Sequence, residues 1–169
     1  MASKKPKQVL YRRKMEGRTN YSKRLSLLLS KKLRLIVRFT NQRVIAQVCE
    51  FNSQSKGDKI LAAVDSFALK KHGWTSSCKN LPAAYLTGLL IAKTVSSQGH
   101  KEAILDTGLR TPVRKGKIYA FLKGALDGGM DIPHGGEDIY PEEDRLFGKH
   151  IKEDLPAQVK KVKEKIMSN

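Results

Sequence analysis

Hydrophobic and polar residues alternate with a period of two along residues 33–39. The hydrophobic side of this segment would carry Leu33, Leu35, Val37 and Phe39, and the other side Arg34, Ile36 and Arg38. Such alternation predicts a strand that is buried on one side. Residues 44–51 are rich in β-branched residues, and the connection Thr40–Arg43 contains an asparagine that suits a hairpin turn. The pattern therefore predicts a β-hairpin whose polar side carries Arg34 and Arg38, which would extend the exposed positive surface of the basic segment before it.

The clearest predicted helix spans residues 79–99. Asn80 can cap its first turn, and Pro82 fits within that turn because the missing N–H costs little there. Gly99 is expected to end it. Small residues recur at every fourth position, at Ala84, Gly88 and Ala92. We expect this stripe to serve close packing rather than to line a ligand groove.

Shorter elements surround this helix. Two further strands are predicted at Lys59–Asp65 and Ala103–Thr107, and two helices at Ser66–Lys71, ended by Gly73, and at Ile118–Asp127, stopped by Gly128 and Gly129. Strands followed by helix, strand and helix are typical of an α/β sandwich with a mixed sheet. The predicted fold class is therefore α/β, with a mixed β-sheet and two packed helices.

The C-terminal part changes character twice. Residues 131–154 are acidic and contain several glycines and prolines, which favours loops. Residues 155–167 are basic and compatible with a helix that has Val159, Val162 and Ile166 on one side. Such a helix could fray on the surface, or it could dock on RNA or on a neighbouring protein. The predicted organisation is a basic arm with a short helix (1–30), an α/β core (31–130), an acidic segment (131–154) and a basic tail (155–169).

Charge indicates the kind of partner. The chain has 33 Lys and Arg residues against 16 Asp and Glu, a net charge of +17. The excess is uneven, because residues 1–43 contain 14 of the basic residues and a single acidic one, Glu16. Nucleic acids and anionic membranes are the usual polyanions that bind such a protein. Concentration of the charge in one segment favours nucleic acid.

The basic segment Tyr11–Arg24 carries Tyr11 and Tyr21 among its arginines and lysines. Aromatic rings beside arginine suit stacking on RNA bases next to phosphate pairing. A charge run alone is usually a solvated tail, but this one continues without a linker into the hydrophobic segment Leu25–Leu29. We therefore expect an RNA-binding arm that orders on contact, preceded by residues 1–8, which we expect to be mobile before binding.

Other classes of protein are disfavoured. No apolar run approaches the roughly 18 residues that span a bilayer, and no signal-peptide core follows the basic start. Cys49 and Cys78 are far apart and outside any C-x-x-C motif, which favours free thiols. The four histidines are too scattered for a structural zinc site. We expect no cofactor, no metal, no small-molecule substrate and no membrane partner.

An enzymatic alternative rests on Asp65, Asp106 and Asp131, each at or just beyond the end of a predicted element. Three such carboxylates could hold two Mg²⁺ ions for phosphodiester cleavage, although their spacing matches no known signature. Nothing resembles the motif of a nucleophilic serine or of a phosphate-binding loop. A further alternative is a generic basic module, which would bind tRNA, duplex DNA and ribosomal RNA equally.

The RNA hypothesis rests on basic side chains, which neutralise phosphates, release counterions and so make binding strongly dependent on salt. Arginine also stacks on bases, which lysine cannot do. The basic candidates are Arg12, Arg13, Lys14, Arg18, Lys23 and Arg24 in the arm, and Arg34, Arg38, Arg43, Arg110, Arg114 and Lys115 beyond it.

Three stretches also resemble one known family. They are RRKMEGRTNYSKRLSLLLSKKLRLIVRFTNQRVIAQV (12–48), KNLPAAYLTGLLIAK (79–93) and ILDTGLRTPVRKGKIYAFLKGALDGGMDIPHGGE (104–137). Together they resemble the universal large-subunit ribosomal protein L eighteen in its archaeal and eukaryotic form, called L five in eukaryotes. The resemblance covers most of residues 11–150, and the tails are not diagnostic. The eukaryotic members carry a long C-terminal extension that this chain lacks, so its length is closer to the archaeal form.

The resemblance implies the translational-machinery-component fold and a non-catalytic structural role in the large subunit of cytoplasmic ribosomes. It implies binding to 5S rRNA and attachment of that RNA to the large-subunit rRNA in the central protuberance. The implied partners also include the neighbouring 5S-binding ribosomal protein, L five in bacteria and L eleven in eukaryotes. The residues that match the RNA-contacting motifs of the family are Arg12, Arg13, Lys14, Gly17, Thr19, Asn20, Tyr21 and Arg24 in the arm, Arg38, Thr40 and Asn41 in the hairpin, and Arg110 in the basic loop.

Overall fold

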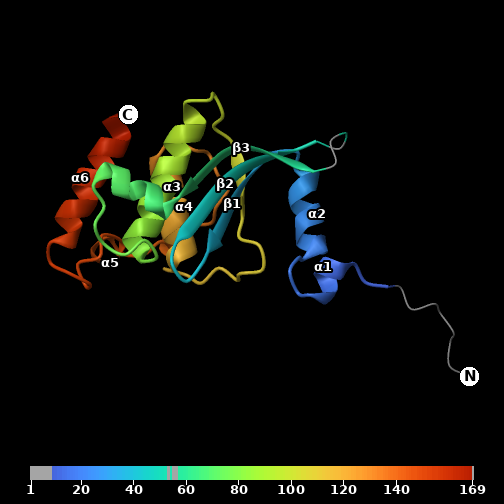
Figure 1. Cartoon of the computed structure of the whole chain (residues 1–169), viewed down its shortest axis with the longest axis horizontal. Coiled ribbons are helices and arrows are strands. Elements are labelled where there is room, and N and C mark those ends of the chain that lie inside the picture. The colour runs from blue at the N-terminus through green and yellow to red at the C-terminus, as the bar shows by residue number, and fades with distance from the viewer. Residues whose placement is uncertain (1–8, 53, 55–56, 169) are drawn as a thin grey trace, which may run out of the picture.

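A mixed β-sheet forms one layer of the molecule in this computed structural model, which describes residues 9–52, 54 and 57–168 (Figure 1). The strands found within these residues are β1 (Leu33–Phe39), β2 (Val44–Phe51), β3 (Asp58–Asp65) and β4 (Ala103–Asp106), in the order β3-β2-β1-β4. β1 pairs antiparallel with β2 and parallel with β4, and β2 pairs antiparallel with β3. The predicted fold class and hairpin are confirmed, and β1 and β2 have the predicted bounds.

Helices make up most of the rest of the described chain. They are α1 (Arg12–Met15), α2 (Tyr21–Leu29), the 3-10 helix η1 (Ser66–His72), α3 (Leu81–Ser96), α4 (Lys117–Asp127), the 3-10 helix η2 (Glu137–Ile139), α5 (Glu143–Leu146) and α6 (Leu155–Ser168). Asn80 caps α3 as predicted, its side chain accepting a hydrogen bond from the backbone N–H of Ala83 at 2.9 Å, and the helix ends at Ser96, before the predicted Gly99. None of these helices is both long and apolar enough to cross a bilayer.

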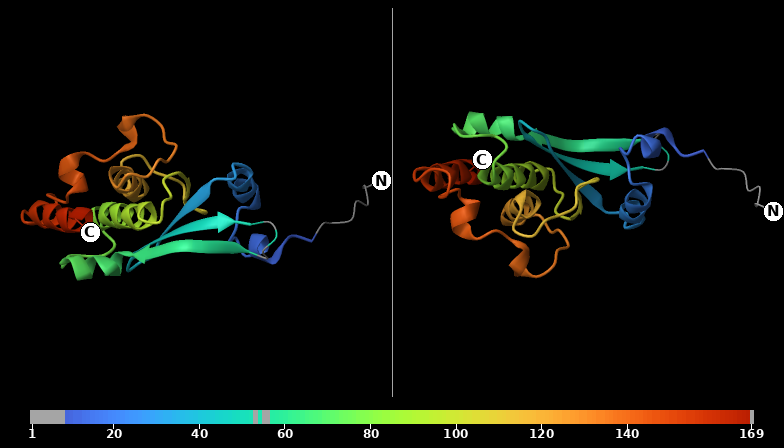
Figure 2. Two further views of the ribbon diagram at one scale, coloured as in Figure 1. Left: turned by 90° about the horizontal axis from the view of Figure 1, so that it is seen from above. Right: turned by 90° about the horizontal axis from the view of Figure 1, so that it is seen from below.

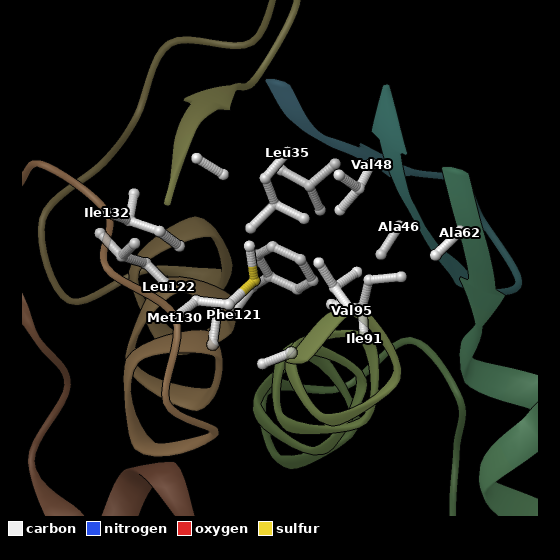
Figure 3. Close-up of a cluster of buried hydrophobic side chains, with 14 of the residues drawn as sticks. Leu35, Ala46, Val48, Ala62, Ile91, Val95, Phe121, Leu122, Met130 and Ile132 are labelled. Atoms are coloured by element: carbon white, nitrogen blue, oxygen red, sulfur yellow. The ribbon is translucent and has the colours of Figure 1, made fainter. Parts of the chain in front are cut away.

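The hydrophobic core lies between the sheet and the helices α3 and α4 (Figure 3). Leu35 and Val48 extend from the sheet towards Ile91 and Val95 of α3 and towards Phe121 of α4. All five side chains are buried. The alternation along residues 33–39 therefore predicted correctly which side of β1 faces the core, since Leu35 and Val37 are buried there.

Helices α3 and α4 run parallel and in close contact. A Cβ atom at Gly88 would overlap the backbone carbonyl of Phe121, and one at Gly124 would overlap that of Tyr85. Only glycine leaves room for two helix backbones at this separation. The stripe of small residues predicted to serve packing does so, and the parallel arrangement brings the N-terminal ends of α3 and α4 to the same end of the molecule.

Helix α6 packs on the outer side of α3, at the opposite end of the molecule from α1 and α2 (Figure 1). Its hydrophobic side, which includes Val159, Val162 and Ile166, is buried in a second cluster with Trp74 and Leu86. α6 confirms that residues 155–167 form a helix with Val159, Val162 and Ile166 on one side. A frayed surface helix is wrong for this segment, and its hydrophobic side docks on the chain's own core rather than on RNA or another protein.

The N-terminal helices α1 and α2 lie on the other side of the sheet from α3 and α4 (Figure 2). α2 begins at Tyr21, after Asn20 caps it by accepting a hydrogen bond from the backbone N–H of Lys23 at 3.0 Å. The expectation that residues 1–8 are mobile concerns a segment outside the described residues. The described part of the arm contains two short helices, and α2 is bonded to β3 and to the loop after β4, which positions the candidate site.

Candidate nucleic-acid interface

Local contacts fold the arm into a tight bend between α1 and α2. Gly17 adopts a left-handed conformation, with φ of 62°, which lets the chain turn at little cost. Arg13 Nε donates a hydrogen bond to Thr19 Oγ1 at 2.9 Å, and the rings of Tyr11 and Tyr21 lie 5.1 Å apart. The predicted contact residues Gly17, Thr19 and Asn20, the cap of α2, therefore also shape the arm, and the rings of Tyr11 and Tyr21 pack against each other at a tilt of 42°.

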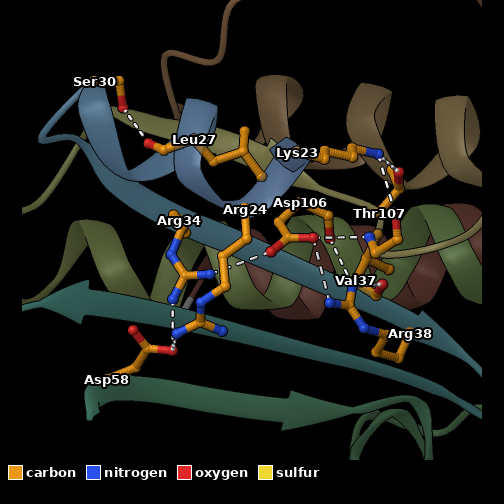
Figure 4. A network of polar contacts seen from close by, with 11 residues as sticks. Lys23, Arg24, Leu27, Ser30, Arg34, Val37, Arg38, Asp58, Asp106 and Thr107 are labelled. Atoms are coloured by element: carbon orange, nitrogen blue, oxygen red, sulfur yellow. Dashed lines mark hydrogen bonds and ion pairs between the residues drawn. The ribbon is translucent and has the colours of Figure 1, made fainter. Parts of the chain in front are cut away.

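Hydrogen bonds and an ion pair hold α2 against the sheet (Figure 4). Lys23 Nζ donates to Thr107 Oγ1 at 2.9 Å and to the carbonyl oxygen of Gly108 at 3.2 Å. Arg24, the next residue along α2, reaches the other end of the network, where its guanidinium pairs with Asp58 at 2.8 Å. The arm is thus anchored to β3 and to the loop after β4, two segments far from it in sequence.

Beneath α2 lies a buried arginine. Arg34 pairs with Asp58 at 2.6 Å and with Asp106 at 3.3 Å, and its side chain is only 2% exposed. The expectation that Arg34 extends the exposed positive surface is wrong, because α2 covers this part of the sheet and two carboxylates neutralise the guanidinium. Arg34 links β1 to Asp58 of β3 and to Asp106 of β4 beneath α2, and its buried side chain cannot reach a partner in this structure.

Asp58 is the shared acceptor of this network. Burial alone would raise the pKa of its carboxyl group, but the hydrogen bonds and positive charges of Arg34 and Arg24 outweigh that effect and lower the pKa. Asp58 is therefore ionised at neutral pH. Sequence reasoning missed this residue, since an aspartate at the edge of a polar loop carries no signal that it faces an arginine from another strand.

Next to the network, the arm and the sheet enclose an open pocket of about 500 Å³. Its lining includes six cationic side chains, Arg13, Arg18, Lys23, Arg24, Arg38 and Arg110, and among the described residues that line it the one carboxylate is Asp106. Asp106 Oδ1 lies 3.3 Å from Arg38 and accepts the backbone N–H of Gly108 at 2.7 Å, which orients the Arg38 guanidinium at the pocket wall. The pocket brings together the arm, β1 and the basic loop between β4 and α4, which contributes Arg110, and an anion site would need such a convergence.

The hairpin turn lies beside this pocket. Thr40 Oγ1 accepts a hydrogen bond from the backbone N–H of Arg43 at 3.0 Å, and this bond closes the turn while leaving Asn41 exposed. Arg110 lies over the ring of Phe39, with its guanidinium carbon 5.6 Å from the ring centroid. Arg43 pairs with Asp65 at 2.8 Å. The turn thus presents Thr40 and Asn41 next to two positioned arginines.

The remaining predicted contact residues lie around the edges. Arg12 and Lys14 are exposed on α1, where Arg12 pairs with Glu16 at 2.8 Å. Arg114 and Lys115 are outside the pocket, and they face the acidic segment, with ion-pair distances of 3.8 Å to Asp138 and 3.0 Å to Glu142. The structure therefore separates these two basic side chains from those that converge under the arm.

The three carboxylates of the enzymatic alternative do not form a site. Asp106 is bound to arginines, Asp65 pairs with Arg43 and caps η1 by accepting the backbone N–H of Ala68 at 3.2 Å, and Asp131 is exposed at an isolated bridge. No group of three or more His, Cys, Asp or Glu residues in the described part of the chain could hold a metal ion.

Comparison with known proteins bears on the same residues. Residues 5–102 match the family described as "Ribosomal large subunit proteins 60S L5, and 50S L18". A relative, the large ribosomal subunit protein uL18 of Korarchaeum cryptofilum (strain OPF8), is 51% identical over 144 residues, which are 85% of this chain and 72% of the relative. The matched range of the family includes the arm, β1, β2 and β3, and therefore most of the anchoring network under α2.

Proposed function

Because this chain belongs to the family of ribosomal large subunit proteins, the universal L eighteen family, we propose that it binds 5S rRNA through the arm and the pocket beneath α2. Membership makes the chain a non-enzymatic structural component of the large ribosomal subunit. The single observation that carries the proposal is the convergence of six cationic side chains on one pocket with one carboxylate among its described lining residues.

The physical basis is electrostatic. Positive charges gathered around a pocket repel one another, and the ion pairs of Arg24 with Asp58 and of Arg38 with Asp106 relieve this repulsion only in part. A phosphodiester backbone supplies further anions at regular spacing. Arg13, Arg18 and Arg110 are exposed and line the pocket, so in our proposal they pair with phosphates. Arg38 lines the same pocket and contributes from the sheet. Arg12, Lys14, Tyr21 and the turn residues Thr40, Asn41 and Arg43 extend the proposed contact surface.

The state of the arm before binding supports a particular mode of recognition. α2 is already attached to the sheet through Lys23 and Arg24, so this part of the arm does not have to fold when RNA binds. A binding surface that is ordered in advance loses less conformational entropy on association. We propose that α2 binds as a preformed helix.

Further partners follow from the place of 5S rRNA in the subunit. We propose that the chain attaches 5S rRNA to the large-subunit rRNA in the central protuberance, next to the other 5S-binding ribosomal protein. Arg114 and Lys115 are exposed outside the pocket, and in our proposal they contact one of these neighbours.

The test is a titration of 5S rRNA with the full chain at several salt concentrations. Replacing Arg13, Arg18 and Arg110 with alanine removes three proposed phosphate contacts. The slope of log K against log salt should then fall by about 2–3, at roughly 0.7–0.9 for each contact. A matched control replaces Lys59, Lys101 and Lys160, which are exposed elsewhere, with alanine and removes the same total charge.

The control distinguishes site-specific contacts from net charge. A loss of affinity and slope confined to the pocket variant supports the proposal. Equal losses in both variants, or equal binding of the native chain to 5S rRNA, tRNA and duplex DNA, would instead indicate a generic basic module and overturn it.

A further inference from the structure

A second, smaller cavity of about 260 Å³ lies at the end of the sheet where the turn between β1 and β2 meets the N-terminal ends of α3 and α4. Figure 1 shows this turn at the lower end of the hairpin. The polar side chains that line the cavity are Thr40, Asn41, Arg43, Lys79, Arg110 and Lys117. Neither Lys79 nor Lys117 is among the RNA contacts predicted from the sequence.

The charged side chains that line this cavity are all positive. Four of its lining residues are cationic, and none of the described residues that line it is acidic. Arg43 is neutralised from outside by Asp65 at 2.8 Å. Neither Lys79 nor Lys117 makes a side-chain hydrogen bond or ion pair with any described residue, and both are exposed. The cavity therefore gathers positive charge without an internal counterion, unlike the buried network around Arg34.

The helices strengthen the field in the same place. α3 and α4 run parallel, and the N-terminal end of each helix carries a partial positive charge. α3 is capped by the side chain of Asn80, whereas the residue before α4 is Gly116, which has no side chain with which to cap it. The dipoles add to the four cationic side chains that define the cavity, and they favour an anion there.

Arg110 connects this cavity with the pocket under the arm. It lines both, its guanidinium carbon is 5.6 Å from the centroid of the Phe39 ring, and its Nη2 donates to the carbonyl oxygen of Phe39 at 3.5 Å. Phe39 also lines both cavities. The two cationic cavities are thus neighbours on one surface, with Arg110 between them.

We propose that the cavity at the N-terminal ends of α3 and α4 binds a backbone phosphate of the RNA strand that occupies the arm pocket, with Lys79 and Lys117 as its phosphate ligands. The strand then runs from the arm, past Arg110, to the ends of the two helices. This inference rests on the proposed function, which it extends by giving the RNA strand a path across the surface and by adding two residues from outside the arm and hairpin.

The double variant Lys79→Ala with Lys117→Ala tests the assignment. Each phosphate contact contributes roughly a four- to fivefold increase in affinity at about 150 mM salt, so 5S rRNA should bind about twentyfold more weakly and the salt slope should fall by about 1.5–2. Lys59→Ala with Lys101→Ala is the matched control, since both lysines are exposed far from the cavity. Thermal unfolding of each variant confirms that the fold is retained.

A second measurement does not depend on substitution. Acetylation of lysines in the native chain, read by mass spectrometry with and without 5S rRNA, should show protection of Lys79 and Lys117 and none of Lys59 and Lys101. If the double variant keeps native affinity and slope while the arm-pocket variant loses them, this inference is wrong and the proposed function stands. If neither variant changes binding, the proposed function fails as well. Protection without loss of affinity would show that RNA covers the cavity without using its charge, and would also overturn the inference.

Discussion

Asp58 is the residue on which the anchoring of the arm depends most, and its replacement by alanine gives the sharpest test of this structure. The carboxylate lies 2.6 Å from Arg34 and 2.8 Å from Arg24. Without it, Arg34 retains only Asp106 among the described residues, at 3.3 Å, while its side chain stays 2% exposed. The variant therefore leaves the buried guanidinium of Arg34 with one of its two carboxylate partners.

The expected loss of stability follows from this geometry. Breaking a fully buried ion pair by removing one partner costs about 3–5 kcal/mol. Asp58 is partly exposed, with 20% of its side chain accessible, and Asp106 still compensates Arg34. We expect the free energy of unfolding to fall by about 2–3 kcal/mol, which lowers Tm by roughly 5–10 °C for a chain of this size.

Chemical denaturation of the variants measures this directly. Asp138→Ala is the control, because Asp138 lies on the surface in a 3.8 Å pair with Arg114 and should cost less than about 0.5 kcal/mol. The decisive variant combines Asp58→Ala with Arg34→Met, which removes the stranded charge. It should be less destabilised than the sum of the two single changes. Additive losses, or a loss below about 1 kcal/mol for Asp58→Ala, would refute the reasoning.

Acid unfolding provides an independent readout of the same carboxylate. The pKa of Asp58 is lowered in the folded chain, despite the burial that opposes this, because Arg34 and Arg24 bind the ionised form. Its contribution to stability is therefore complete above the unfolded pKa, near 4, and is lost as pH falls through the lower folded value. The native chain should lose more stability than the Asp58→Ala variant between about pH 4 and pH 2, and parallel acid curves would contradict this.

Two other predictions concern the core. Gly124→Ala should destabilise the chain by roughly 2–3 kcal/mol in a denaturant titration, because the new Cβ would overlap the carbonyl of Tyr85. Gly135→Ala, where a Cβ meets nothing within 4 Å, should change stability little, and equal effects would mean that α3 and α4 pack less closely. Burial raises the pKa of Cys49 and of Cys78, so both thiols should react with a disulfide reagent only slowly until denaturant is added. Fast modification of the native chain would show that one of these thiols is accessible.

Much of the fold is local enough to be predicted from the sequence. The bounds of β1 and β2 follow from alternation along the chain, and the start of α3 follows from Asn80, whose side chain caps the helix as its residue type suggests. The basic arm follows from the distribution of charge, and Arg13 and Arg18 do line a cationic pocket. These features depend on neighbouring residues, so the sequence contains the information that decides them.

What the sequence could not decide is which distant groups meet. Arg34 occupies a polar position of β1 and reads as exposed, yet it is buried, because α2 covers it and because Asp58 and Asp106 approach from other strands. Lys79 and Lys117 lie far apart in the sequence, and only the parallel packing of α3 and α4 brings them to one cavity. The sequence by itself determined where charge and hydrophobicity lie along the chain. Only the tertiary structure decided which charges are neutralised inside the protein and which remain for a partner, because burial and pairing depend on contacts between residues far apart in the chain.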